Sequence, residues 1–180
     1  YKEFKDHPLL YKLNYGKFGS ENCKWVFLSS FQHYSLSEYL NEQGVDTTLT
    51  VWSPYFGNDL TDVIDELKAQ GFSELNIIPA RTGSQKIRIT TENYEKCSAM
   101  KGVRFRQDRL PASAQESFVH AKVWLTPDFL AIGSWNMTRA GINESGNGNN
   151  NVEAGIIYNI NTQEYCKIID AYPTINLRLP

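Results

Sequence analysis

The strongest constraint on the fold is a strand, helix, strand pattern in the first half of the chain. Residues 48–52, Thr-Leu-Thr-Val-Trp, are β-branched or apolar and predict a strand. The next apolar residues fall at the i, i+3, i+4, i+7 spacing of one helix face: Leu60, Val63, Ile64 and Leu67. Gly71 ends this helix, and residues 75–78 predict the next strand. Because such units cross over and pair in parallel, we expect an α/β fold with a mixed, largely parallel central sheet flanked by helices.

Further elements are predicted on both sides of this unit. Short apolar, β-prone runs predict strands at residues 25–30, 103–105, 119–125, 129–133 and 152–158. Helical spacing follows over residues 36–40 and ends at Gly44, and weaker helical cues cover residues 92–100. Residues 143–151 are rich in Asn and Gly and predict a loop. We expect residues 1–44 to be an N-terminal packing segment and residues 45–180 to form one domain.

Composition restricts the class of protein. The chain has 180 residues and a net charge of -2, so one domain is expected and any basic, nucleic-acid-binding surface must be local. No apolar run is long enough to span a membrane. Three widely spaced cysteines argue against a disulfide framework and favour a reducing, cytoplasmic compartment. Neither a CxxC nor an HExxH spacing is present, so we expect no metal and no cofactor.

Three short patterns carry residues suited to phosphoryl chemistry. His120 and Lys122 lie two residues apart in a β-prone run, so both side chains are expected on one strand face. Ser134 and Asn136 follow an apolar strand at a turn, and Asn151 and Glu153 again alternate. Imidazole can attack phosphorus, ammonium and amide groups can hold anionic oxygens, and a carboxylate can fix the imidazole tautomer.

Each pattern alone has an ordinary structural explanation. A single histidine in a strand is more often structural or surface-exposed, Gly-Ser-x-Asn is a common turn, and Asn-x-Glu is a common strand edge. His7 and His33 are not followed by a lysine at the right place and are expected to be structural or surface residues. The order and spacing of the three patterns together point instead to a site.

Together these residues resemble the signature of the phospholipase D superfamily, which runs His-x-Lys, Asp, Gly-Ser-x-Asn. The corresponding residues here are His120, Lys122, Asp128, Gly133, Ser134 and Asn136, followed by Asn151 and Glu153. Upstream, residues 49–80 look like the first strand, helix and second strand of one half-domain of this superfamily. Asp128 comes one residue later than in the family pattern, so it has either the family's structural role or that of a turn residue.

The resemblance implies a mechanism and an assembly. His120 would form a covalent phosphohistidine without a metal, while Lys122 and Asn136, supported by Ser134, hold the phosphate oxygens. Glu153 would fix the far imidazole nitrogen. A second histidine is needed as the acid, and the chain contains one His-x-Lys pattern. Either two copies form a homodimer, or a separate half-domain supplies the second motif and residues 1–44 are its trailing edge.

The resemblance leaves the substrate more open. Basic residues gather over residues 81–109, and Arg104 and Arg106 are the candidates in this stretch for following a phosphate backbone. The aromatic residues near strand ends, Tyr55, Phe56 and Trp135, could stack on bases, and Asn151 could contact substrate. We expect a nuclease acting on DNA or RNA. The alternatives are a phospholipid-cleaving or phosphatidyl-transferring enzyme, and a non-catalytic nucleic-acid-binding module.

Overall fold

One sheet organises the part of the chain that the structure, a computed structural model, describes: residues 24–29, 35–43, 47–80, 87–108, 120–142 and 153–177. Eight strands lie in the order β1-β7-β6-β5-β2-β3-β4-β8. The strands are β1 (Trp25–Ser29), β2 (Thr47–Ser53), β3 (Phe72–Pro79), β4 (Val103–Asp108), β5 (Val123–Leu125), β6 (Phe129–Gly133), β7 (Ala154–Asn159) and β8 (Thr174–Asn176).

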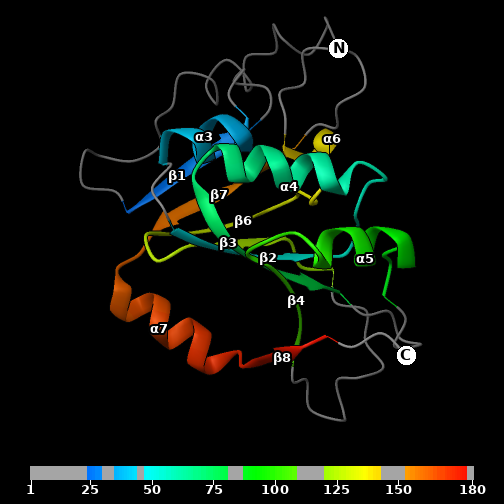
Figure 1. The fold of residues 1–180 in the computed structure, drawn as a ribbon. Coiled ribbons are helices and arrows are strands. Elements are labelled where there is room, and N and C mark those ends of the chain that lie inside the picture. The colour runs from blue at the N-terminus through cyan, green and yellow to red at the C-terminus, as the bar shows by residue number, and fades with distance from the viewer. Residues whose placement is uncertain are drawn as a thin grey trace, which may run out of the picture.

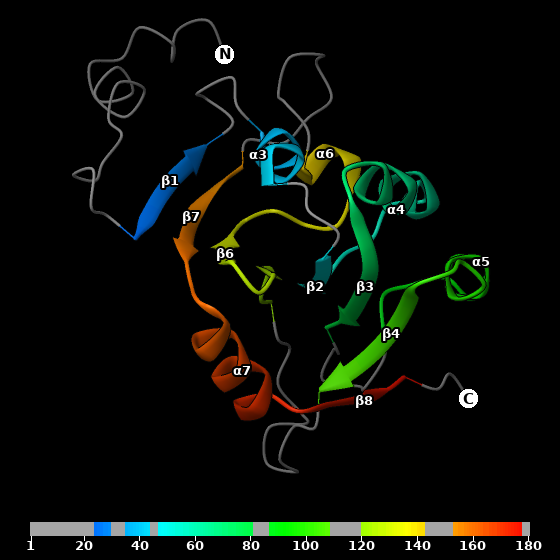
Figure 2. The same cartoon turned by 60° about the vertical axis from the view of Figure 1, so that its left-hand side comes forward.

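Helices cover the sheet unevenly. The helices are α3 (Leu36–Gln43), α4 (Leu60–Ala69), α5 (Thr91–Ser98), α6 (Arg139–Ile142) and α7 (Thr162–Ala171). Helices α3, α4 and α6 lie on one side of the sheet and α7 on the other (Figures 1 and 2). The predicted apolar stripe of α4 is completely buried, which places the main core between α4 and the sheet.

The predicted strand, helix, strand unit is confirmed. Strands β2 and β3 pair in parallel, with Leu49 opposite Leu75, and α4 connects them. Gly71 follows α4 with a φ of 103°, a conformation that other residues adopt only with strain. Its N–H donates to the Lys68 carbonyl at 3.0 Å. The glycine therefore turns the chain from the helix into β3.

The expectation of a largely parallel sheet is wrong. Only the pairs β2–β3 and β3–β4 are parallel, whereas β1–β7, β7–β6, β6–β5, β5–β2 and β4–β8 are antiparallel. Strands β5 and β6 are joined by a short turn at residues 126–128, and a parallel pair would need a much longer crossover. The short turn therefore imposes antiparallel pairing on β5 and β6.

This strand order brings chain segments from distant parts of the sequence to one edge of the sheet. Pairing of Ser29 with Ala154 and of Trp52 with Val123 sets the carboxyl ends of β1 and β2 beside the amino ends of β7 and β5. The carboxyl end of β6 joins them, because Ile132 pairs with Val123. We call this edge, marked by Ser53, Lys122, Ser134 and Glu153, the site edge.

Several features differ from the sequence-based expectations or lie beyond them. The strand expected over residues 119–125 is confined to β5, and α6, α7 and β8 were not predicted. Strand β1 lies in the same sheet as the rest, and the division of the chain at residue 44 stays a prediction. The loop expected at residues 143–151 lies outside the described residues. Within the described segments, none of the helices is both long and apolar enough to cross a membrane.

Candidate active site

His120 and Lys122 meet where the chain enters β5. The Lys122 ammonium lies 3.0 Å from Nδ1 and 3.1 Å from Nε2 of His120, and 3.3 Å from the His120 carbonyl oxygen. An ammonium only donates hydrogen bonds, so an imidazole nitrogen can accept from it only when that nitrogen carries no proton. The contact is therefore compatible with a neutral imidazole, whose bare nitrogen is the group that a nucleophile needs.

Both residues precede β5 instead of lying within it, which corrects the expectation that they share a strand face. Pairing between β2 and β5 stops at Trp52 and Val123, because β2 ends at Ser53 and the chain turns there. The lysine side chain nevertheless reaches the histidine ring. Their proximity comes from this lead-in segment and not from strand alternation.

Burial controls the charge on Lys122. The residue is 7% exposed, and burial lowers the pKa of its ammonium below the ordinary value for lysine. The Glu153 carboxylate, on a residue that is 5% exposed and precedes β7, acts in the opposite direction and raises the pKa of Lys122. A buried cation thus faces His120 with a buried carboxylate nearby to stabilise its charge.

Trp135 anchors the Gly-Ser-Trp-Asn segment in the core. The residue is 2% exposed, and the Trp124 indole N–H donates to its carbonyl oxygen at 3.0 Å. Its ring lies over Gly133 and Gly155, which pair in the sheet. A Cβ at Gly133 would sit 2.7 Å from the ring, and one at Gly155 would sit 2.5 Å from Cη2. The prediction that Trp135 offers a stacking face to substrate is therefore wrong.

Ser134 joins the ends of β6 and β7. Its N–H donates to the Ala154 carbonyl at 2.9 Å, and its hydroxyl oxygen accepts from the Ala154 N–H at 2.9 Å. The hydroxyl also lies 3.3 Å from the Ala154 carbonyl oxygen. Because Glu153 immediately precedes Ala154, this clamp holds the carboxylate-bearing residue beside the Gly-Ser-Trp-Asn segment.

Asn136 carries an unpaired buried polar atom. Its Oδ1 has no hydrogen-bond partner among the described residues, although the atom is buried. An unsatisfied buried polar group costs about 1–3 kcal/mol, so such a group calls for a functional explanation. The Asn136 carbonyl accepts from the Thr138 N–H at 2.8 Å, and a Cβ at Gly141 would lie 2.5 Å from that oxygen. The backbone is fixed, while Oδ1 is left to accept a hydrogen bond from a donor on a ligand.

Ser53 was not predicted as a site residue, and it ties β2 to this segment. The side chain is fully buried, and its oxygen accepts from the Met137 N–H at 3.0 Å. The hydroxyl donates to the Tyr55 carbonyl at 2.8 Å. Asn136 is thereby held beside the carboxyl end of β2. A serine at the end of a strand is too common to have signalled this role.

Tyr55 lies against the catalytic candidates. Its ring packs edge-on to the His120 ring, with centroids 5.6 Å apart and planes at 75°. The Arg88 guanidinium carbon lies 4.9 Å from the Tyr55 ring centroid, and the Lys122 ammonium lies 6.0 Å from it. Tyr55 therefore gathers an imidazole and two cations around one aromatic ring. Phe56, the next residue, is partly buried against the core.

Asp128 is not brought to the site. It is exposed in the turn between β5 and β6, whereas Lys122 lies at the other end of that hairpin. Its N–H donates to the Thr126 hydroxyl at 3.2 Å, and its carbonyl accepts from the Ile160 N–H at 2.9 Å. Both bonds use the backbone, so the structure favours the turn residue over the family's structural role.

The two arginines of β4 are engaged elsewhere. Arg104 forms an ion pair with Glu74 at 2.8 Å. Arg106 donates to the Thr174 hydroxyl at 3.0 Å and to Asn176 Oδ1 at 3.2 Å, which fastens β8 to β4. Strands β2 and β3 separate β4 from β5, so neither arginine is brought beside His120. Asn151, which was also predicted to contact substrate, lies outside the described residues.

The remaining His, Cys, Asp and Glu residues of the described segments are the candidates for a second site. In the described segments, no three His, Cys, Asp or Glu side chains gather in a way that could hold a metal ion. Cys97 and Cys166 are free thiols, and burial raises the pKa of Cys97 to about 11. A thiol with so high a pKa stays protonated at neutral pH and is a poor nucleophile.

Comparisons with known proteins agree with this architecture. No family model and no curated protein matches the sequence. Among solved structures, NucT from Helicobacter pylori is similar with a TM-score of 0.56 and 12% identity, over 86% of this chain and 99% of that one. Nuc from Salmonella typhimurium, described as a phospholipase D family member, gives 0.51 and 13%, over 85% and 98%.

A third solved structure extends the likeness to a longer protein. Phosphatidylserine synthase from Haemophilus influenzae Rd KW20 gives a TM-score of 0.53 and 15% identity, over 93% of this chain and 44% of that one. Such low identities establish the fold and not the activity. The resemblance seen in the His120 to Glu153 pattern is thus confirmed at the level of architecture: the chain has a phospholipase D-like fold.

Proposed function

We propose that the chain is a metal-independent phosphodiesterase, specifically a nuclease, that works through a phosphohistidine at His120. The observation that carries the proposal is the contact of the buried Lys122 ammonium with the His120 ring, 3.0 Å from Nδ1 and 3.1 Å from Nε2. Asn136, whose buried Oδ1 has no partner among the described residues, lies on the adjoining segment, where the Gly133 N–H donates to the Lys122 carbonyl at 3.4 Å. A nucleophile and two phosphate ligands thus occur at one edge.

The chemistry proceeds in two displacements. The lone pair of a His120 nitrogen attacks phosphorus, the P–O bond to the leaving group breaks, and an acid protonates the departing oxygen. Water then attacks the phosphohistidine, which releases a phosphate monoester and restores the imidazole. Lys122 would exchange the imidazole nitrogen for a phosphate oxygen. Rotation of the Asn136 side-chain amide would direct its NH₂ group to a second phosphate oxygen. Lys122 and Asn136 would then both stabilise the negative charge that grows in the transition state.

The leaving-group acid must come from a second half-site. Attack and departure occur on opposite sides of phosphorus, so one His120 cannot readily serve both. A two-fold axis would supply the second histidine, because an isologous interface brings the same residue of each copy together. We propose a homodimer in which two His120 side chains face one phosphate. A separate half-domain with its own His-x-Lys motif is the alternative source.

Nucleic acid is the favoured substrate. Tyr55 and Arg88 lie beside His120, and an aromatic face with an arginine is suited to single-stranded nucleic acid. The similarity to a phosphatidylserine synthase supports a second candidate, transfer or hydrolysis at a phospholipid headgroup. A third candidate, a non-catalytic nucleic-acid-binding module, predicts that the wild-type chain binds nucleic acid and cleaves none.

Incubation of the chain with labelled single- and double-stranded DNA in EDTA tests the proposal. Wild-type protein and Asp128→Ala should cleave DNA, whereas His120→Ala should bind it, remain folded and leave it intact. A parallel incubation with phospholipid vesicles should release no headgroup. Activity that disappears in EDTA and returns with Mg²⁺ or Zn²⁺ would contradict the mechanism. Headgroup release without DNA cleavage would favour the lipid candidate.

A further inference from the structure

A cation outside the His-x-Lys and Gly-Ser-x-Asn patterns lies next to the site. Arg88 is exposed, and its guanidinium carbon lies 4.9 Å from the Tyr55 ring centroid. The His120 ring centroid is 5.6 Å from that same centroid. The distance between the Arg88 guanidinium carbon and the His120 ring centroid is therefore no greater than the sum of these two distances.

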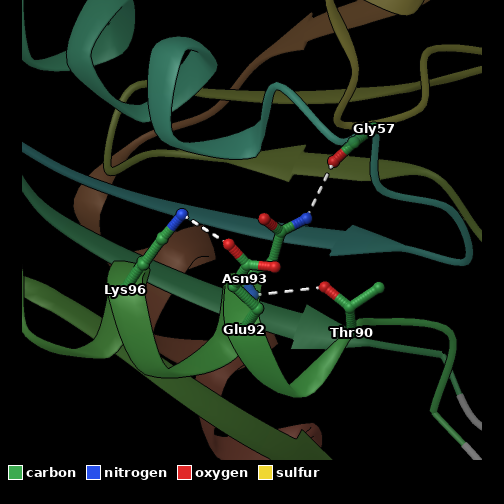
Figure 3. A network of polar contacts seen from close by, with 5 residues as sticks. All are labelled: Gly57, Thr90, Glu92, Asn93 and Lys96. Carbon is green, nitrogen blue, oxygen red and sulfur yellow. Dashed lines mark hydrogen bonds and ion pairs between the residues drawn. The ribbon is translucent and has the colours of Figure 1, made fainter.

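Backbone anchors fix the segments that carry Arg88 and Tyr55. Thr90, two residues after Arg88, caps α5, and its hydroxyl oxygen accepts from the Asn93 N–H at 3.2 Å (Figure 3). The Asn93 side-chain amide donates to the carbonyl of Gly57, two residues after Tyr55, at 3.2 Å (Figure 3). The start of α5 is thus fastened to the loop after β2. The network thus fixes the backbone close to Arg88 and to Tyr55, and the Arg88 side chain reaches the Tyr55 ring from this position.

Two cations beside one nucleophile exceed what a single phosphodiester requires. Lys122 already reaches the His120 nitrogens and, with Asn136, serves the phosphate under attack. Arg88 contacts the Tyr55 ring, which His120 also contacts. A planar guanidinium can stack on an aromatic ring while its edge binds an anion. Neighbouring phosphates of a polynucleotide are joined through a single sugar, so a phosphate that flanks the one at His120 can lie on the side where Arg88 is held.

We propose that Arg88 binds the phosphate next to the one that His120 attacks, so that the site selects a chain of phosphates over a lone phosphodiester. The inference rests on the proposed function and specifies its substrate class. Tyr55 holds the guanidinium at a set distance from His120. A phospholipid with one phosphodiester would leave Arg88 unused, whereas a polynucleotide engages it at every position along the strand.

The decisive comparison uses two substrates and three variants. One substrate is a labelled single-stranded oligonucleotide, and the other is bis(4-nitrophenyl) phosphate, which has no neighbouring phosphate. The variants are Arg88→Ala, Arg88→Lys and the matched control Lys101→Ala, which removes an exposed cation just before the amino end of β4, at the opposite edge of the sheet. All four proteins are first compared by circular dichroism and thermal unfolding.

Arg88→Ala should lower kcat/KM for the oligonucleotide roughly tenfold, as expected for one charge-assisted contact, and leave the small substrate unaffected. Arg88→Lys should recover part of the loss, and Lys101→Ala should behave like wild type. The slope of log affinity against log salt for the single strand should fall by about 0.7 in Arg88→Ala. Equal losses on both substrates would show that Arg88 only supports Tyr55 and would overturn the proposal.

Binding separates this inference from the proposed function. The oligonucleotide affinity and its salt slope are measured in the His120→Ala protein with and without Arg88→Ala. If wild type cleaves neither substrate, the proposed function fails, while an unchanged salt slope in this pair would independently refute the role of Arg88. If wild type cleaves both substrates and Arg88→Ala shows no selective loss, the function stands and the inference fails.

Discussion

Replacement of Gly155 by alanine tests how the Gly-Ser-Trp-Asn segment is held. A Cβ at residue 155 would lie 2.5 Å from Cη2 of the Trp135 ring and 2.6 Å from the Ile132 carbonyl oxygen. Gly155 does not have the positive φ that would strain alanine, so the cost is steric. Trp135 is 2% exposed, and the Trp124 indole N–H donates to its backbone carbonyl. The Trp135 ring therefore has little room to move away from a new Cβ.

The expected cost follows from these contacts. Overpacking of a filled core costs about 1–3 kcal/mol, and the reduced freedom of the unfolded chain returns about 0.4–1 kcal/mol. A net loss of roughly 1–2 kcal/mol in the free energy of unfolding is therefore expected for Gly155→Ala. A shift of Trp135 must also move Ser134 and Asn136, so turnover of the folded protein should fall as well.

Urea unfolding followed by tryptophan fluorescence measures the stability, and kcat is measured where both proteins are folded. Ile156→Ala is the matched control, because Ile156 is the next residue of β7 and is 49% exposed. This control should change the free energy of unfolding by less than about 0.5 kcal/mol. If Gly155→Ala is as stable and as active as Ile156→Ala, the packing argument for the segment is refuted.

Further predictions concern the turn, the charge and the assembly. Asp128→Ala should keep wild-type kcat, because Asp128 lies at the far end of the β5–β6 hairpin; a loss comparable to that of Lys122→Ala would restore its family role. Burial lowers the pKa of Lys122, so activity should decline on the alkaline side at a lower pH than an ordinary lysine would dictate. Because Glu153 raises that pKa, Glu153→Gln should move the decline to still lower pH, and an unmoved pH profile would count against the charge pair. In subunit mixing, excess His120→Ala chain should suppress wild-type activity through mixed dimers, whereas a fully active monomer in sedimentation would exclude the homodimer.

Patterns within short stretches of sequence predicted the elements that are formed by residues close together in the chain. The β2–α4–β3 unit followed from apolar periodicity and a terminal glycine, and it formed as expected. The pairing direction of the remaining strands depends on which distant segments meet, and periodicity carries no information about that. Helix α7 was missed although Asn161 and Glu164 form a reciprocal capping box, a signal that is visible in the sequence.

The site also contains residues that the sequence predicted correctly by position and one that it did not. His120, Lys122, Ser134, Asn136 and Glu153 were identified from spacing, and the structure places all of them at the site edge. Trp135 was misassigned because its position near a strand end suggested an exposed stacking face. Burial of its ring depends on a space left by two glycines on adjacent strands, which only the strand pairing reveals.

Trapping of the covalent intermediate tests the central claim most directly. Wild-type protein is mixed with labelled oligonucleotide in EDTA and quenched at alkaline pH, because phosphohistidine is labile to acid. The adducted peptide is then located by mass spectrometry. We predict a nucleotide-bearing adduct on His120 that is absent from His120→Ala and retained in Asp128→Ala. Turnover without any adduct on His120, or an adduct on another residue, would contradict the assignment of His120 as the nucleophile.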